Sequence, residues 1–298
     1  MTGSAFAALP DDIAAVHPWP VARFAAPHGE LAVLDVGPRD APVLLALHGN
    51  PTWSFYWRAL IAAFSDRYRV IVPDHLGAGR SSKPQDAAYR LHQHVDNVVA
   101  LIEAYHLSDI TLIVHDWGGA IGMGAATRLP ARFSRFVITN TAAFRSLRIP
   151  PSIALCKVPG FGALAVRGAN AFAGIATVRA TAKGLSDIAR RGLLWPYQSW
   201  HDRIVTLRFV QDIPLGAWHP SYAELSRIDD GLAGLADRPM LILWGDADFC
   251  FSPAFRAEWS QRFPAATVHA WSDVGHYVME DAPDRVVAAI AAFLGPSA

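Results

Sequence analysis

Five short apolar runs, separated by loops and helix-like patterns, constrain the fold of this chain more than any other feature. They lack the polar alternation of a strand that has one face in water, and this is how strands buried on both faces of a parallel sheet read. Between the second and third runs, Leu91, Val95, Val98 and Ile102 follow the spacing of an amphipathic helix. The alternation predicts a doubly wound, mostly parallel α/β sheet. The five runs are Val43–Leu47, Arg69–Val72, Ile110–Val114, Phe136–Thr139 and Met240–Trp244.

The pattern also predicts how the chain divides into domains. Val21–Ala26 and Leu31–Val36 flank a turn and predict a hairpin before the parallel strands, and Thr267–Trp271 predicts a last strand. Residues 143–225 contain helical patches and Gly or Pro breaks but no convincing strand. We therefore expect a core domain of residues 1–142 and 226–298, with residues 143–225 inserted as a helical cap over the sheet.

Composition excludes several classes of function and indicates a cellular location. Lys+Arg 26 and Asp+Glu 26 leave the 298-residue chain with zero formal net charge, so it has no overall field to collect nucleic acid. Two cysteines, Cys156 and Cys250, do not make a disulfide framework. The first residues show no signal-peptide pattern, and no apolar run reaches the roughly 18 residues of a transmembrane segment. These features predict a cytoplasmic protein without a transmembrane segment, and they leave a homo-oligomer open.

The sequence from Val114 to Gly119, VHDWGG, carries the strongest chemical signal. An apolar strand runs into a glycine-rich helix start with Asp116 at the turn, which is the strand–elbow–helix context of a nucleophile. A carboxylate is already ionised at neutral pH, so Asp116 can attack a saturated carbon and form an alkyl ester without a base. The alternative is that Asp116 only caps the helix, but a cap needs neither Trp117 nor the two following glycines.

Three further residues complete a catalytic set. Asn50 follows the strand Val43–Leu47, and in this architecture the loop there offers a backbone N–H to an oxyanion. Asp248 and then His276 follow later strands, in the chain order nucleophile, acid, base. His276 is the expected general base toward water and Asp248 its orienting partner, although Asp246 lies near enough in sequence to compete.

These segments resemble the α/β-hydrolase superfamily and, within it, the haloalkane dehalogenases. The resemblance implies that Asp116 is the nucleophile and that Trp117 and Asn50 donate N–H groups to the leaving halide. One branch of that family has its acid after the sixth strand, but residues 138–142, ITNTA, contain no carboxylate, so Asp248 must serve. This combination is similar to the third dehalogenase subfamily, which also contains the β-lactone decarboxylases of olefin biosynthesis. The matching segments are HGNPTWSFYWR (48–58), PDHLGAGRSSKP (73–84), HDWGG (115–119), WGDAD (244–248) and GHY (275–277).

The expected function is therefore a haloalkane dehalogenase acting on a small apolar substrate. It would release halide, an alcohol and a proton through an Asp116 ester hydrolysed by His276-activated water, with no metal or organic cofactor. The alternative is decarboxylation of a cis-3,4-dialkyl β-lactone (oxetan-2-one) at the same residues. Epoxide hydrolysis is less favoured. The alkoxide that it forms must be hydrogen-bonded or protonated, normally by two cap tyrosines, and the cap contains only Tyr197, in a segment that can simply pack, and Tyr222.

Other patterns are weaker. A serine esterase using Ser54 or Ser81 fails because neither serine lies at a strand–elbow–helix junction, and the complete catalytic set disfavours a non-catalytic binding protein. The run His92–Asp96, HQHVD, imitates a metal motif, but helical spacing separates His94 from the other two ligands. His115 is expected to face away from the site. Ten basic and four acidic residues give the cap a charge of +6, interpreted as a solvated face or, alternatively, as a docking surface for an acidic partner or lipid.

Overall fold

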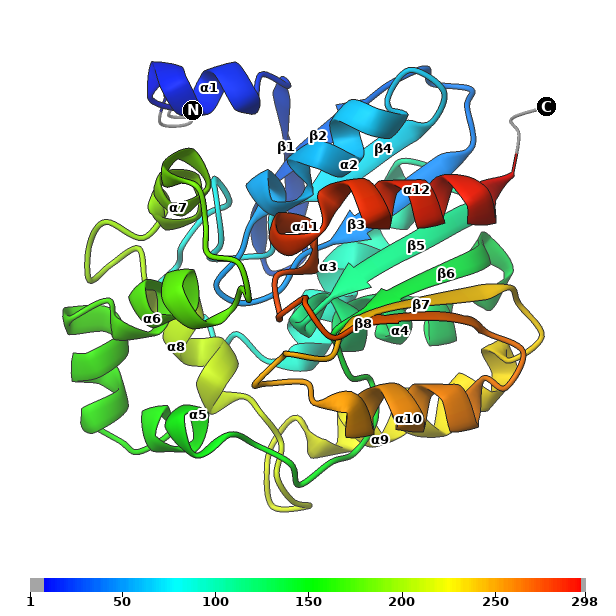
Figure 1. Cartoon of the computed structure of the whole chain (residues 1–298). Helices are drawn as coiled ribbons and strands as arrows, with labels where there is room; N and C mark the ends of the chain where they lie inside the picture. The colour runs from blue at the N-terminus through cyan, green and yellow to red at the C-terminus, as the bar shows by residue number, and fades with distance from the viewer. Residues whose placement is uncertain (1–7, 296–298) are drawn as a thin grey trace.

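The protein, described here from a computed structural model, is built around one twisted sheet (Figure 1). The structure describes residues 8–295. The prediction that the first residues form no signal peptide therefore falls largely on residues outside the described range. Eight strands of the described chain pair in the order β1-β2-β4-β3-β5-β6-β7-β8. Their bounds are β1 (Val21–Ala26), β2 (Gly29–Val36), β3 (Val43–Leu47), β4 (Arg69–Pro73), β5 (Ile110–His115), β6 (Phe133–Thr139), β7 (Met240–Gly245) and β8 (Thr267–Trp271).

The sheet confirms the predicted α/β-hydrolase architecture. Strands β3 to β8 pair in parallel, whereas β2 is antiparallel to both β1 and β4. All five apolar runs form strands. Strand β6 begins at Phe133, three residues before its apolar run. Its second and third residues, Ser134 and Arg135, are polar and only half-buried, so apolar character alone does not reveal where this strand begins.

Helices cover both faces of the sheet and divide its side chains into two cores. On β3, Leu45 and Leu47 join the core that contains α3, whereas Leu44 and Ala46 join the core that contains α2 and α12. This alternation is the period of two expected along a strand buried on both faces. The helices of the core region are α1 (Asp11–Val16), η1 (Ser54–Trp57), α2 (Arg58–Phe64), α3 (Leu91–Ala104), α4 (Trp117–Arg128), η2 (Pro130–Arg132), η4 (Leu232–Leu235), α10 (Pro253–Arg262), α11 (Val278–Asp281) and α12 (Pro283–Leu294).

The helices formed by residues 151–211, between β6 and β7, stand to one side of the sheet (Figure 1). Helix α9 (Tyr222–Gly231) instead lies beside α10, runs past residue 225 and packs against α3 and α4 of the core region. The boundary at residue 225 therefore stays a prediction. Within residues 8–295 the longest helix, α3, has 14 residues, and none is long and apolar enough to cross a membrane. The cap helices are α5 (Pro151–Cys156), the π-helix η3 (Ala163–Gly168), α6 (Ala171–Arg179), α7 (Asp187–Leu194), α8 (Ile204–Gln211) and α9 (Tyr222–Gly231).

Candidate active site

The turn between β5 and α4 holds Asp116 in a sharply bent backbone. Its φ is +51°, a left-handed value that a non-glycine residue rarely adopts. The neighbouring glycines allow this bend, since a Cβ on Gly49 would overlap the Asp116 side chain and one on Gly118 would overlap the Leu47 carbonyl. The Asp116 side chain makes no capping hydrogen bond to α4. The geometry is that of an elbow that presents the carboxylate to a cavity, and it disfavours a simple helix cap.

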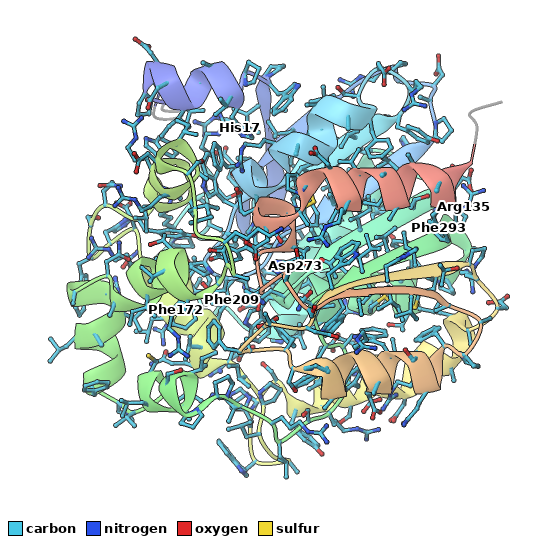
Figure 2. The ribbon with its side chains drawn as sticks, in the orientation of Figure 1. His17, Arg135, Phe172, Phe209, Asp273 and Phe293 are labelled. Atoms are coloured by element: carbon cyan, nitrogen blue, oxygen red, sulfur yellow. The ribbon has the colours of Figure 1, made fainter. Side chains whose placement is uncertain are left out.

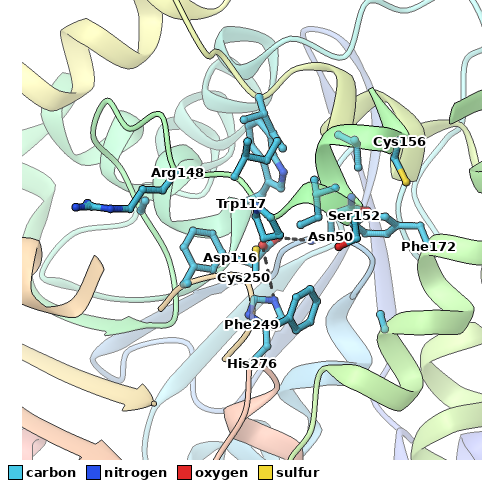
Figure 3. Close-up of a pocket in the computed structure, with 18 of the residues that line it drawn as sticks. Asn50, Asp116, Trp117, Arg148, Ser152, Cys156, Phe172, Phe249, Cys250 and His276 are labelled. Carbon is cyan, nitrogen blue, oxygen red and sulfur yellow. Dashed lines mark hydrogen bonds and ion pairs between the residues drawn. The ribbon is translucent and has the colours of Figure 1, made fainter. Parts of the chain in front are cut away.

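Asn50, in the loop after β3, contacts the same carboxylate. Its backbone N–H donates a 2.6 Å hydrogen bond to Asp116 Oδ1, drawn as a dashed line in Figure 3. Its side chain lines the cavity, where Nδ2 donates to the Thr206 carbonyl of α8 at 3.1 Å and Oδ1 is buried without a partner within the described residues. The predicted oxyanion N–H is therefore beside Asp116, and the side-chain amide joins the sheet side of the cavity to the cap.

Trp117 lines the cavity next to Asp116. Its ring lies against Phe209 of α8, with ring centroids 4.9 Å apart. The half-buried ring thus contacts both the elbow and the cap. This position is compatible with an N–H donated to a leaving group.

His276 connects the nucleophile candidate to a second carboxylate. Its Nδ1 lies 2.8 Å from Asp248 Oδ2. Its Nε2 lies 3.8 Å from Asp116 Oδ2, a pair drawn as a dashed line in Figure 3. Asp246 points elsewhere and pairs with Arg256 of α10 at 3.1 Å. The geometry therefore favours Asp248 over Asp246 as the partner of His276, as the sequence analysis does.

Asn140 is a site residue whose role the sequence analysis does not assign. It follows β6, where the sequence analysis looks only for a carboxylate, and its Nδ2 donates to Asp248 Oδ2 at 2.8 Å. The same side chain exchanges two hydrogen bonds with the backbone of Gly245, at 2.8 and 3.0 Å. With the Cys250 N–H donating to Asp248 Oδ1 at 2.6 Å, both carboxylate oxygens are held. The sequence signal that could have pointed to this residue is that Asn140 stands in the segment after β6 where one branch of the family has its catalytic acid.

His115 is not among the described residues that line the cavity, but it lies closer to the site than the sequence leads one to expect. Its ring lies 4.5 Å from the His276 ring, and its Nε2 lies 2.9 Å from the His276 carbonyl oxygen. Burial lowers the pKa of His115 well below its usual value, with the nearby His276 adding to the effect. This closeness has a simple cause: the loop after β8 folds back over the end of β5, which no local pattern in the sequence reveals.

Burial and charge act in opposite directions on the two central groups. Burial raises the pKa of Asp116, while His276 and the N–H groups of Asn50 and Trp117 oppose that rise. Burial lowers the pKa of His276, but the charge and hydrogen bond of Asp248, together with Asp116, leave it above its usual value. The negative charge of Asp116 therefore favours protonated His276, and the positive charge of His276 favours ionised Asp116.

A cavity of about 210 Å³ lies over Asp116, between the sheet and the cap (Figure 3). Its floor is polar, with Asn50, Asp116, Trp117 and His276, whereas most of the rest of its lining is apolar. Neither Tyr197 nor Tyr222 is among the described residues that line it, and the Tyr197 hydroxyl donates instead to the Thr52 carbonyl at 3.3 Å. The cap contributes, among others, Phe144, Ile149, Ile153, Phe172, Val210 and Ile213.

The HQHVD run has other partners in the structure. Asp96 pairs with His28 at 2.9 Å and with Arg128 at 2.5 Å. His94 is buried on another face of α3, with its ring against Phe209. Across residues 8–295, no group of three or more His, Cys, Asp or Glu side chains is placed to hold a metal ion.

The fold and the elbow together define a class of protein, and the chain belongs to the alpha/beta hydrolase fold family, which matches residues 42–283. It is 44% identical over 85% of its length to a cis-3-alkyl-4-alkyloxetan-2-one decarboxylase of Shewanella oneidensis, covering 81% of that protein. A protein of the same name from Xanthomonas campestris pv. campestris is 42% identical, over 89% of this chain and 92% of the relative.

Haloalkane dehalogenases are also relatives, at lower identity. One from Mycolicibacterium paratuberculosis is 32% identical over 83% of this chain and 82% of its own. Among solved structures, the haloalkane dehalogenase DbeA from Bradyrhizobium elkani superposes with a TM-score of 0.84 at 26% identity, over 92% of this chain and 97% of the other. The chain is therefore an enzyme of the alpha/beta hydrolase superfamily with relatives of both activities.

Proposed function

We propose that this chain decarboxylates cis-3,4-dialkyl β-lactones, with haloalkane dehalogenation as the second candidate. The order expected from the sequence is the opposite, although the catalytic residues are shared by the two activities and do not separate them. The identities of 44% and 42% to decarboxylases, against 32% to a dehalogenase, reverse that order. The observation that carries the proposal is a single carboxylate, Asp116, held by an N–H on the floor of a mostly apolar cavity.

The proposed first step opens the lactone ring. An Asp116 oxygen attacks ring carbon C4 from the side opposite the ring oxygen, so a C–O bond to the enzyme forms and the ring C4–O bond breaks. The leaving group is a carboxylate still attached through C3, and it needs N–H donors but no acid catalyst. The side-chain N–H groups of Asn50 and Trp117 are assigned to it, and a protonated His276, held by Asp248, adds an imidazolium N–H beside it.

The proposed second step releases both products without water. The C3–carboxylate bond breaks, its electron pair forms the C3–C4 double bond, and the C4–O bond to Asp116 breaks to regenerate the carboxylate. Inversion at C4 followed by an anti elimination converts a cis lactone into a cis alkene and carbon dioxide. Atoms and charge balance without a proton, an oxidant or a co-reactant.

Dehalogenation uses the same residues but adds a water step. After Asp116 displaces halide, His276 would take a proton from water, and the resulting hydroxide would attack the ester carbonyl, whose oxyanion accepts the Asn50 and Trp117 backbone N–H groups. The 3.8 Å between His276 Nε2 and Asp116 Oδ2 supports a base in reach of that carbonyl. Epoxide hydrolysis receives less support, since the two cap tyrosines that would serve it do not line the cavity.

The test offers the purified protein a cis-dialkyl β-lactone and a short dibromoalkane in parallel, both in water enriched in ¹⁸O. The proposal predicts cis alkene and carbon dioxide from the lactone, with no ¹⁸O incorporated into the Asp116 carboxylate and faster turnover than for the bromide. Bromide release with an ¹⁸O-labelled alcohol, and no alkene from the lactone, would instead establish the dehalogenase. A trans alkene would contradict the proposed inversion and anti elimination.

A further inference from the structure

The outer part of the cap carries only one sign of charge. From Trp117 to Ser186 the sequence contains no Asp or Glu, and within residues 143–186 it has six Lys or Arg. Two of these are neutralised by carboxylates elsewhere: Arg145 pairs with Asp229 and Asp230, and Lys183 with Asp273. The other four have no ion pair with any residue that the structure describes: Arg148, Lys157, Arg167 and Arg179.

The same part of the cap exposes large apolar side chains. Of the eleven exposed large apolar residues in the described chain, nine lie in the cap, while Val16 and Val268 lie outside it. Leu164 and Val178 are 68% and 73% exposed. A soluble monomer scatters such side chains singly, so their concentration in one segment indicates a surface that meets an apolar phase. Seven fall between residues 147 and 178: Leu147, Leu155, Val158, Phe161, Leu164, Ile175 and Val178.

Leu155, Leu164 and Val178 belong to α5, η3 and α6, helices that stand at the side of the molecule away from most of the sheet (Figure 1). Figure 2 labels Phe172 of α6 at that side. The π-helix η3 packs against α5, α6 and α8.

Trp200 extends the surface, since it is 46% exposed and its ring centroid lies 4.7 Å from the Arg167 guanidinium. The Lys157 ammonium is half-buried and donates to three backbone carbonyls near the end of α8, so it is not available at the surface. We call the remaining surface the outer cap face: the seven apolar residues named above, Trp200, and Arg148, Arg167 and Arg179.

The cavity over Asp116 opens onto the outer cap face. Arg148, Ser152 and Ile175 are exposed, yet each also lines the cavity. Figure 3 shows Arg148 and the Ser152–Phe172 side at opposite ends of the group that surrounds Asp116. A molecule that approaches the outer cap face therefore meets an entrance to the candidate active site.

We propose that the outer cap face docks on an anionic lipid bilayer and that apolar substrate enters the cavity directly from it. From Leu147 to Arg179 exposed apolar side chains and cations alternate without a carboxylate in the sequence. This combination matches the two attractions of an interfacial protein, apolar insertion and attraction to anionic headgroups. A tryptophan beside an arginine suits the headgroup level of a membrane. Entry of substrate from the bilayer rests on the proposed function, because a dialkyl lactone and its alkene product partition into lipid. The docking itself does not rest on it.

Docking is tested without substrate by co-sedimentation of the full chain with vesicles. Vesicles of phosphatidylcholine with 30% phosphatidylglycerol, a composition chosen for this experiment, are compared with vesicles of phosphatidylcholine alone. The proposal predicts binding to the anionic vesicles that is roughly 30-fold weaker in Arg148→Gln/Arg179→Gln, since each arginine near an anionic surface is worth about 1 kcal/mol, a roughly five-fold factor. It also predicts about ten-fold weaker binding in Leu164→Ser/Val178→Ser.

Matched variants outside the cap are the controls. Arg67→Gln and Val268→Ser remove an exposed arginine and an exposed valine from the core region and are expected to bind vesicles as the unmodified chain does. Equal binding to both vesicle types, or cap variants that bind like these controls, would overturn the proposal. Self-association that Leu164→Ser/Val178→Ser abolishes, without vesicle binding, would overturn it by assigning the face to a second copy of the chain.

Activity measurements separate this proposal from the proposed function. Leu164→Ser/Val178→Ser is expected to turn over a lactone dispersed in detergent at the unmodified rate but a lactone embedded in anionic vesicles several-fold more slowly. Vesicle binding without any lactone turnover would retain docking and reject the decarboxylase. Turnover in detergent without vesicle binding would retain the decarboxylase and reject docking.

Discussion

The two walls of the cavity are built on different principles. On the sheet side, Asp116, Asp248 and His276 are buried, and hydrogen bonds or turns fix each of them. On the cap side, residues such as Phe172 contribute apolar surface to the cavity, and the outer surface of the same helices is exposed. The sheet side therefore determines which bonds can be made and broken, whereas the cap determines which molecules arrive. Substitutions on the two walls should differ in size and in the kinetic constant that they change.

The largest effect is expected at Asp116. Asp116→Asn keeps the size of the side chain but removes the nucleophile, so turnover of both the lactone and the bromoalkane should fall at least about 10⁴-fold. The measurement is kcat for alkene or bromide release, with the melting temperature confirming that the variant folds. Residual alkene formation at the unmodified rate would show that another group performs the chemistry.

His276→Phe should separate the two candidate reactions. It removes the base that activates water, so a bromoalkane should leave a stable alkyl group on Asp116, and steady-state bromide release should fall about 10³-fold. Decarboxylation uses no water, so alkene formation should fall much less. Mass spectrometry of the intact chain after incubation with each substrate measures the difference. An equal loss of both activities, with no added mass, would reject the division of roles made here.

A smaller effect is expected at Asn140, a positioning residue that acts through Asp248. Asn140→Leu removes the 2.8 Å donor to Asp248 Oδ2 and should lower dehalogenase-type turnover roughly 10- to 100-fold. Because Asp248 is the main group that raises the pKa of His276 against burial, a displaced Asp248 should lower that pKa. Activity that requires neutral His276 would then begin at lower pH than in the unmodified chain.

The control for Asn140 is Asp246→Asn, which alters a carboxylate two residues from Asp248 that pairs with Arg256 instead. It should leave kcat and the pH profile unchanged and the free energy of unfolding within about 0.5 kcal/mol. If Asn140→Leu lowered stability without moving the pH profile, Asn140 would be only a structural residue.

The smallest effect is expected on the cap wall. Phe172→Ala enlarges the cavity away from Asp116, so it should raise KM for short substrates a few-fold while kcat changes little, and it should favour longer alkyl chains. A series of lactones of increasing chain length measures this. A loss in kcat as large as that of Asn140→Leu would remove the distinction between the two walls.

The same distinction explains what the sequence could predict. That Asp116, Asn50, Asp248 and His276 lie close together was predictable, because each follows an apolar strand and parallel strands bring their carboxyl ends to one edge. Their catalytic roles stay predictions. The role of Asn140 and the position of His115 were not predictable, because both depend on contacts with the loops after β7 and β8, more than 100 residues away. The cap helices pack without a repeating pattern, and their effect on substrate choice could not be read from spacing.

The central claim is that the Asp116 carboxylate bonds covalently to substrate carbon. The most direct measurement is peptide mapping of the protein quenched within milliseconds of mixing with a cis-dialkyl β-lactone. The account predicts the mass of one whole lactone on the peptide that contains Asp116, and on no other. The same mass on the peptide that contains Cys250, or rapid alkene formation with Asp116 unmodified at every time point, would contradict it.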